Sequence, residues 1–215
     1  MVSMDRRALP SPESLEELFA AQRSIRKFRD SVPDDDLIDR LIAAARMAPT
    51  DILEIELILV TNPSMLQALE AHALDRVEKI YLRFYDRPWI YELARRLTPR
   101  INQDDRVRLR HILRRGSLFY GASVLVLAVA DPRPPAAEAS CHYALHNMIL
   151  MAGTLGLGTC LSGIAQDLLA RDSLVRKALG IPKSKKILGV LLLGYPDVDF
   201  PHAAGRIAIA ARRIS

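Results

Sequence analysis

Two almost continuous apolar runs, separated by a long apolar helix, constrain the fold of this chain most strongly. Residues 123–130 and 187–193 have the short apolar pattern of strands that are buried on both faces. Between them, residues 137–155 carry apolar side chains nearly all the way round a helix, a pattern typical of a protein centre or a subunit interface. Buried strands that long helices separate in the sequence predict an α+β fold with one central sheet.

Capping residues and apolar spacing predict further elements before this region. A capping box at Ser14 opens a first helix, and Asp34 or Asp35 caps a second. Residues 54–61 alternate and then become fully apolar, which predicts a strand, and Asn62 caps a third helix.

Shorter elements are predicted after the long helix. Gly156 ends that helix, residues 158–161 form a short strand, and two small helices follow up to Gly180. Residues 207–210 resemble a strand that has no sequence neighbour to pair with.

Composition limits the ligands and the location of the protein. The chain has 215 residues and a formal net charge of +5, which fits an anionic ligand such as a phosphorylated cofactor. Few aromatic residues and no zinc-finger or RNP-type pattern argue against nucleic acid. The first ten residues lack an apolar signal region, and no apolar run is long enough to span a bilayer. Cys141 and Cys160 are too far apart in the sequence for a metal-binding or redox-active pair. We expect a cytoplasmic protein with reduced thiols and no membrane partner.

Residues 81–115 are dominated by arginines, interleaved with tyrosines, leucines and Trp89. The spacing is helical and is broken at Pro88 and Pro99. The segment is too short to bury a core alone, so we interpret it as a helical insertion. Three roles stay open for it: an anion-accepting lid, a contact surface for an acidic partner, or a solvated face with Trp89 and the tyrosines packed beneath.

A compact basic cluster follows the first helix. Arg23, Ser24 and Arg26 place two guanidiniums and a hydroxyl within four residues. Guanidiniums fork onto phosphate oxygens, and a hydroxyl can satisfy a remaining lone pair. The cluster therefore indicates a phosphate site, although such clusters also occur on ordinary solvated surfaces.

Four segments resemble the nitroreductase family in their order and spacing. They are residues 23–28 (Arg-Ser-Ile-Arg-Lys-Phe), 43–49 (Ala-Ala-Ala-Arg-Met-Ala-Pro), 155–160 (Leu-Gly-Leu-Gly-Thr-Cys) and 193–196 (Leu-Gly-Tyr-Pro). The resemblance extends from about residue 14 to about residue 206, nearly the whole chain. It implies a nitroreductase-like α+β fold with a central mixed β-sheet flanked by helices.

The resemblance also implies how the chain is organised. Residues 1–215 would form a single nitroreductase-like domain, with residues 81–115 as a helical insertion within it. Two subunits would form an intertwined homodimer in which the C-terminal arm, residues 197–215, reaches the partner's sheet. The unpaired strand at 207–210 and the apolar helix at 137–155 would then lie at the subunit interface.

Two FMN molecules would lie at that interface, with their phosphates on the basic cluster. By this resemblance, Arg23, Ser24 and Arg26 hold the phosphate and ribityl chain. Arg206, in the C-terminal arm, adds a further phosphate contact.

The resemblance assigns a second group of residues to the flavin ring. Ser162 and Gly163 match the loop whose backbone N–H approaches flavin N5, where a donor stabilises the electron-rich reduced ring. Pro49, Thr50 and Asp51 match the segment that packs against the flavin from the other subunit.

The implied activity is that of an FMN-dependent oxidoreductase. NAD(P)H would pass a hydride to flavin N5 and leave, and a nitroaromatic, a quinone or a similar acceptor would then take its place. No side chain need act as acid or base, because the cofactor carries the chemistry. Two alternatives stay open: a divergent relative with weak or no flavin binding that binds a ligand or partner, and a specialised FMN-using reductase, for example in flavin breakdown or reductive dehalogenation.

Several positions depart from the family's usual residues. Gln22 stands where members usually have an arginine, and Leu53 and Ile55 stand where members have an asparagine and a glutamine that hydrogen-bond the flavin. Asp51 and Glu54 add negative charge near the phosphate and the ring. Each lost hydrogen bond to a buried polar group costs about 1–3 kcal/mol, so weaker flavin binding is expected.

Three further candidates have structural explanations. Cys160 is expected to be a small buried residue rather than a redox group. His142 and His146 have the i, i+4 spacing of a metal pair, but no third ligand stands at a fitting distance in the sequence, and no metal is expected. Asn147 is expected to be a buried amide with its hydrogen bonds satisfied.

Overall fold

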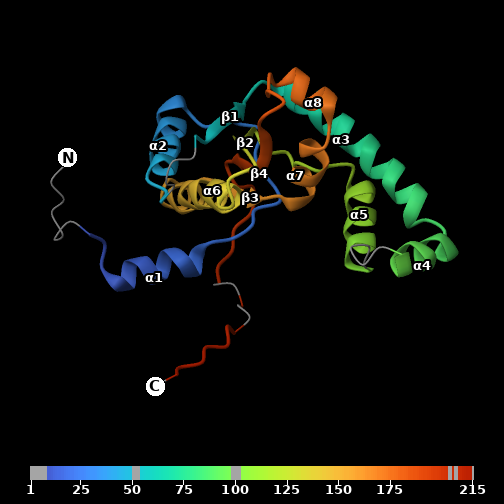
Figure 1. Ribbon diagram of the computed structural model, residues 1–215. Helices are drawn as coiled ribbons and strands as arrows, with labels where there is room; N and C mark the ends of the chain where they lie inside the picture. The colour runs from blue at the N-terminus through green and yellow to red at the C-terminus, as the bar shows by residue number, and fades with distance from the viewer. Residues whose placement is uncertain (1–8, 50–53, 98–102, 203–204, 206–207, 215) are drawn as a thin grey trace.

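The computed structural model describes residues 9–49, 54–97, 103–202, 205 and 208–214. The helices in this part are α1 (Pro12–Ala21), α2 (Asp35–Arg46), α3 (Pro63–Phe84), α4 (Pro88–Leu97), α5 (Gln103–Arg115), α6 (Ala137–Thr154), α7 (Gly163–Ala170) and α8 (Ser173–Ala178) (Figure 1). The strands are β1 (Glu56–Val60), β2 (Val124–Ala130), β3 (Gly158–Leu161) and β4 (Lys186–Gly194). These elements confirm the predicted α+β fold.

The four strands form one sheet in the order β1-β2-β4-β3. Every pairing between these strands is antiparallel. The mixed character expected from the sequence is confined, among the described residues, to one isolated parallel bridge between Ser24 and Thr159. The two predicted buried strands, β2 and β4, lie at the centre of the sheet because they are apolar on both faces.

Strand β2 explains why its sequence is apolar without alternation. Successive side chains of a strand point to opposite faces. Val124, Val126 and Ala128 join the cluster formed with α2 and α6, whereas Leu125 and Leu127 join the cluster formed with α3, α5 and α7. Helices therefore cover both faces of the sheet, and no residue of β2 meets solvent.

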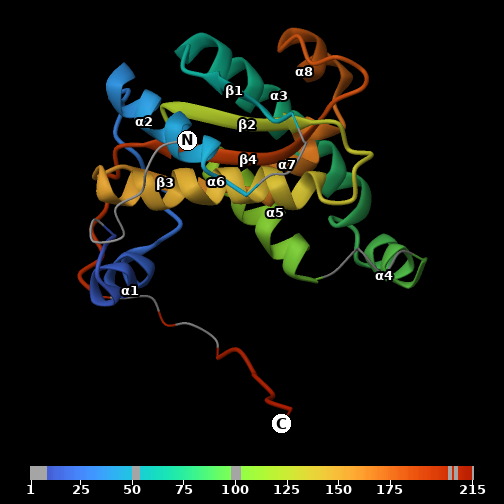
Figure 2. The same ribbon diagram turned by 60° about the vertical axis from the view of Figure 1, so that its left-hand side comes forward.

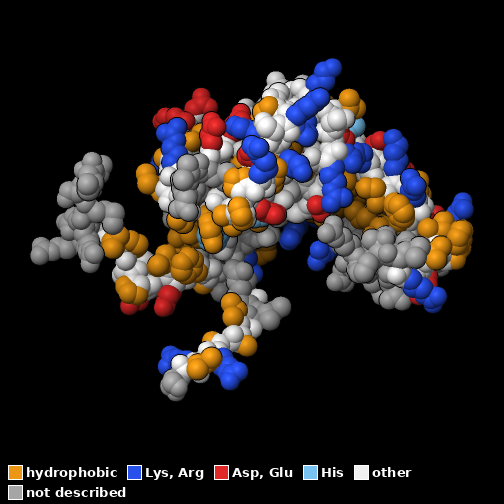
Figure 3. Space-filling view, in the orientation of Figure 1, with side chains coloured by type: hydrophobic (Ala, Val, Ile, Leu, Met, Phe, Trp, Pro, Cys, Tyr) orange, Lys and Arg blue, Asp and Glu red, His pale blue; other side chains and the backbone are white. Residues whose placement is uncertain are grey.

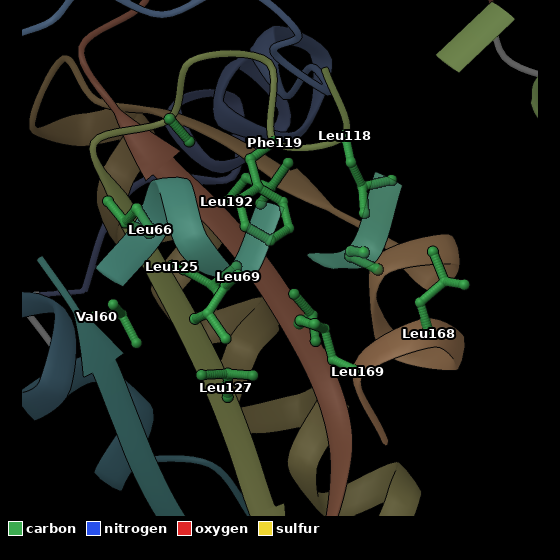
Figure 4. Packing of buried hydrophobic residues seen from close by; sticks show 14 of the residues in the cluster. Val60, Leu66, Leu69, Leu118, Phe119, Leu125, Leu127, Leu168, Leu169 and Leu192 are labelled. Carbon is green, nitrogen blue, oxygen red and sulfur yellow. The ribbon is translucent and has the colours of Figure 1, made fainter. Parts of the chain in front are cut away.

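The core on the α3 side consists of large aliphatic side chains from several elements. Figure 4 shows Leu125 and Leu127 of β2 facing Leu69 of α3, with Leu169 of α7 beside them. On the opposite face, Leu145 of α6 is fully buried against the sheet. Helix α6 therefore lies within the protein along one face and leaves its other face outward (Figure 2).

Most predicted element boundaries hold, and the start of the first helix is wrong. Helix α1 begins at Pro12, and the Ser11 hydroxyl accepts a hydrogen bond from the Ser14 N–H at 3.2 Å. Proline at the first helical position has the φ angle of a helix, which moves the cap from Ser14 to Ser11. Asn62 caps α3 as predicted, and Gly156, with φ of +70°, follows the end of α6.

The Arg-rich segment, predicted as an insertion, comprises the end of α3 together with α4 and α5, which project from the side of the sheet (Figure 1). Tyr85 is buried and stacks on Tyr81 with 6.3 Å between ring centroids. Trp89 is 66% exposed, so the alternative in which it packs beneath a solvated helical face is wrong for Trp89 in the single subunit. Ile112 of α5 is buried in the main core, which attaches the insertion to the domain.

After β4, residues 196–202 stay in contact with the segment that follows α1, and the C-terminal segment then extends away from the body of the subunit (Figures 1 and 2). Residues 208–214 form no strand in the single subunit, and Ile209 is 94% exposed. Ile207, the start of the predicted strand, lies outside the described residues. The pairing of this arm with a partner's sheet stays a prediction.

No helix in the described part is long and apolar enough to cross a membrane.

Candidate functional site

An extended segment after α1 carries the basic cluster along the edge of the sheet. The Ile25 N–H donates to the Thr159 carbonyl of β3 at 2.8 Å. Further along, the Arg29 N–H donates to the Tyr195 carbonyl at 2.9 Å, just after β4. The backbone of the cluster is therefore fixed between β3 and the segment that follows β4.

Apolar residues of the same segment determine which way the polar ones face. Ile25 and Phe28 are buried, while Ser24 and Arg26 are exposed. Ile25 packs directly over Gly158, where a Cβ would lie 2.9 Å from Ile25 Cγ1. The first residue of β3 must therefore be small, because the Ile25 side chain fills the space that a larger side chain at Gly158 would need.

Two adjoining hollows lie along this segment. The larger has a volume of about 330 Å³ and lies between α1, the end of α6, the start of β3 and the segment after β4. The smaller, of about 170 Å³, is lined by Gln22, Arg23, Ser24, His146, Ile149, Thr159 and Leu161. The structure thus places Arg23 and Ser24 at one cavity, whereas Arg26 lines neither hollow.

Arg23 is half-buried and makes two contacts with the C-terminal segment. Its guanidinium carbon lies 5.3 Å from the centroid of the Phe200 ring. Its Nη2 donates a hydrogen bond to the backbone carbonyl of His202. Neither partner was identified from the sequence, because contacts so distant along the chain leave no local pattern.

Arg26 adds positive charge beside β3. Cys160, on this strand, is buried, and burial raises the pKa of its thiol, while the charge of Arg26 opposes that shift. Burial together with Glu138 likewise raises the pKa of Cys141 to about 11. Both cysteines are free and mostly protonated at neutral pH, which confirms Cys160 as a small buried residue.

The other end of β3 leads to the second predicted group of residues. The Ser162 N–H donates to the Val190 carbonyl at 2.9 Å, and the Ser162 hydroxyl accepts from the Ala165 N–H at 3.3 Å. Gly163 is the first residue of α7, and a Cβ there would meet nothing within 4 Å. First-turn amides of a helix have no intrahelical acceptor, and the Ser162 N–H is already bonded to Val190, so of these two amides the Gly163 N–H can reach a ligand.

Strand β3 therefore joins two donor groups. Ser24 pairs with Thr159 at one end, and Gly163 lies just beyond the other end. Four residues of extended chain correspond to about 13 Å, at roughly 3.3 Å per residue. The arrangement can hold an anionic group at one end of an elongated ligand and an acceptor atom at the other.

Of the remaining residues predicted to contact FMN, only Pro49 lies in the described part of the chain, and it is not brought to this edge. Pro49 is exposed after α2 and lines neither hollow. Asn147 is half-buried rather than buried, and its amide donates to the Ala44 carbonyl at 3.2 Å, which ties α6 to α2. Thr50, Asp51 and Arg206 lie outside the described residues.

His146 is a lining residue that the sequence analysis considered only as a metal ligand. It is exposed on α6 and lines the smaller hollow with Arg23 and Ser24. The available signal was a histidine within the mainly apolar stretch of residues 144–152. No group of three or more His, Cys, Asp or Glu side chains suited to a metal ion occurs in the described part of the chain.

An antiparallel sheet with helices on both faces and a basic cluster at its edge defines an α+β protein suited to a phosphate-bearing ligand. The sequence profile described as "Nitroreductase family" matches residues 20–195. The chain therefore belongs to the nitroreductase family.

Individual relatives agree with this assignment. A protein of Methanothermobacter thermautotrophicus, named as a candidate NADH dehydrogenase/NAD(P)H nitroreductase, is 24% identical over 184 residues, which are 84% of this chain and 76% of that protein. The FMN-bound nitroreductase of Desulfitobacterium hafniense DCB-2 has a TM-score of 0.71 and 23% identity, covering 94% of this chain and 100% of that one. Iodotyrosine deiodinase bound to FMN and 3-iodo-L-tyrosine has a TM-score of 0.68 and 16% identity, covering 93% and 99%.

Proposed function

We propose that this protein is an FMN-dependent oxidoreductase that uses NAD(P)H to reduce a small acceptor such as a nitroaromatic or a quinone. Family membership supports this proposal, and the D. hafniense nitroreductase was crystallised with FMN. One observation carries it: strand β3 connects the basic cluster at Ser24 to the exposed helix start at Gly163.

The donors at this edge fit the chemistry of FMN. Arg23 and Arg26 would neutralise the phosphate, and the Ser24 hydroxyl would bind a remaining phosphate or ribityl oxygen. The Gly163 N–H would donate to the ring nitrogen that becomes electron-rich on reduction. When bound, FMN supplies the hydride-transfer chemistry, and the residues of the chain bind, orient and shield it.

Exposed apolar surface supports the proposal of a homodimer. Helix α1 has no buried residue, and Phe19 is 46% exposed on it. Tyr143 on the outward face of α6 is 53% exposed, and Leu161 beside the smaller hollow is 44% exposed. Figure 3 shows hydrophobic side chains gathered over α1. A second subunit would cover this surface.

The same dimer would complete the FMN site. Pro49, Thr50 and Asp51 would pack on the flavin from the partner subunit, and Arg206 would bring a further charge to the phosphate. We propose that residues 197–215 form an arm that is exchanged between the two subunits. Residues 1–215 would form one domain, and residues 81–115 would be an insertion in it that shapes the choice of substrate. Residues 197–202 contact their own subunit at Lys27 and Arg23, and the exposed residues 208–214 support an arm that continues from there to a partner.

The end of the proposed site that would hold the flavin ring has fewer polar groups than the end that would hold the phosphate. Ile55 is half-buried and packs against the cluster formed by α2 and α6, so it serves the core rather than a ligand. This observation favours a second candidate, a relative with weak flavin binding that acts by binding a ligand or partner.

A direct test is the spectrum of the purified protein. Bound FMN should give a yellow protein, or flavin absorbance should appear on titration with FMN, and NADH or NADPH should then be oxidised when menadione or nitrobenzoate is added. A colourless protein that binds no flavin from excess FMN would exclude the oxidoreductase and leave the binding protein. Product analysis with nitro and halogenated aromatic acceptors would separate simple nitroreduction from a specialised reduction.

A further inference from the structure

The position of the Arg23 side chain depends on a segment that lies after the last strand. Its Nη2 donates to a carbonyl 179 residues further along the chain, at His202, and its guanidinium lies over the Phe200 ring. Arg23 and Phe200 both line the larger hollow, and Arg23 also lines the smaller one beside Ser24. The guanidinium therefore stands between the two hollows and is held from the C-terminal side.

These two contacts leave donors available to an anion. A guanidinium has five N–H donors, and the His202 carbonyl takes one of them. The contact with Phe200 is a cation–π contact, in which the face of the ring attracts the guanidinium and no carbonyl or carboxylate takes a donor. Donors of Arg23 can therefore reach a phosphate beside the Ser24 hydroxyl while Phe200 helps to hold the guanidinium in place.

Phe200 is brought to this position by contacts nearer to β4. The Asp197 N–H donates to the Lys27 carbonyl at 3.0 Å, and the Lys27 ammonium lies 2.5 Å from an Asp197 carboxylate oxygen. These bonds tie the start of the C-terminal segment to the basic cluster. A side chain held in its binding geometry before the ligand arrives loses less conformational entropy on binding.

We propose that Phe200 is a positioning residue that presents Arg23 to the phosphate of the bound flavin nucleotide. Phosphate binding thereby depends on the docking of residues 197–202 against the basic cluster. This inference rests on the proposed function, because it requires that FMN occupies the edge of the sheet.

The test compares FMN with riboflavin, which has the same ring and ribityl chain but no phosphate. Dissociation constants of both are measured on the full chain by flavin fluorescence. Phe200→Leu removes the ring and should raise the Kd for FMN by about 3- to 30-fold, while the Kd for riboflavin stays within about 2-fold. Phe200→Tyr keeps a ring and should retain the wild-type preference for FMN.

Two controls separate positioning from a general effect. Leu174→Ala removes apolar bulk from an exposed position on α8 that lines neither hollow, and it should leave the ratio of the two constants unchanged. Phe200 is 46% exposed, so Phe200→Leu should fold, which thermal unfolding checks. If that variant does not fold, Arg23→Lys, which loses the planar fork, should lower the FMN preference by itself.

The outcomes distinguish this inference from the proposed function. A wild-type protein that binds neither flavin would overturn the proposed function. A wild-type protein that prefers FMN, together with a Phe200→Leu variant of unchanged preference, would overturn the inference alone. So would a Phe200→Tyr variant that loses the preference as fully as Phe200→Leu.

Discussion

His72 on α3 and Asp172 before α8 are joined by a hydrogen bond of 2.7 Å between Nε2 and Oδ2. Arg76 donates to the same carboxylate oxygen, and the other oxygen accepts from the amides of Leu174 and Val175 at 2.8 and 3.1 Å. One buried carboxylate thus caps α8 and attaches it to α3.

Replacing this carboxylate should destabilise the protein and change its response to acid. Burial raises the pKa of Asp172, but hydrogen bonds from His72, the Val175 amide and Arg76 outweigh burial and hold it well below its usual range. Because the folded-state pKa lies below the unfolded value of about 3.9, the stabilisation is present above that value and is lost as pH falls through the folded pKa. Asp172→Asn should lower the free energy of unfolding at pH 7 by about 2–3 kcal/mol, and by less near pH 3.

Urea denaturation at several pH values measures this difference. Asp75→Asn is the matched control, because Asp75 also pairs with a cation, Lys79, but on the exposed surface. Such surface pairs contribute little, so this control should leave the urea midpoint unchanged. An Asp172→Asn variant with an equal deficit at pH 7 and pH 3 would contradict the role assigned to the carboxylate charge.

Gly189 in β4 provides the space into which α6 packs. A Cβ at Gly189 would lie 2.5 Å from Leu145 Cδ1. Gly189→Ala should therefore push α6 from the sheet and lower the free energy of unfolding by about 1–3 kcal/mol. Leu145→Ala in the same chain should cancel part of that loss, which a double-mutant cycle by urea denaturation would detect. Strictly additive losses would show that the two residues do not compete for this space.

Gly158 should affect the binding site more than the fold. A Cβ there would lie within 3.2 Å of three Ile25 side-chain atoms, and a β-branched side chain has few alternative rotamers. Gly158→Ala should displace the segment that carries Ser24 and weaken FMN binding by about ten-fold, a loss of about 1.4 kcal/mol. Gly163→Ala is the steric control for stability, because its Cβ would meet nothing within 4 Å. Unchanged FMN affinity in Gly158→Ala would argue that this edge of the sheet does not bind the phosphate.

Glu70 of α3 organises the turn that leads into β2. Its Oε1 accepts from the Ser117 hydroxyl at 2.8 Å and from the amides of Leu118 and Phe119 at 2.7 and 2.6 Å. Glu70→Ala would leave these donors unpaired in a partly buried place and should cost about 1–3 kcal/mol in urea denaturation. Glu16→Ala, an exposed change on α1, should cost less than about 0.5 kcal/mol. Similar losses in the two variants would contradict the capping role of Glu70.

Strong periodic patterns made much of the fold predictable from the sequence. Strands β2 and β4 were recognised because a strand covered on both faces needs an uninterrupted apolar run, and Gly156 marked the end of α6 because only glycine readily adopts its positive φ. The exposure of Trp89 was not predicted, since periodicity gives the apolar face of a helix but not whether another element covers it.

The sequence by itself determined the elements, the nitroreductase family and the chemical character of the basic cluster, because these depend on residue types at short spacing. Only the tertiary structure decided which residues surround the cluster. Ser24 pairs with Thr159, Arg23 contacts the Phe200 ring, and the Ser162 amide donates to the Val190 carbonyl. Such contacts join segments far apart in the chain through backbone hydrogen bonds and a cation–π contact. Their partners are selected by the packing of the whole sheet, so no local pattern of residues encodes them.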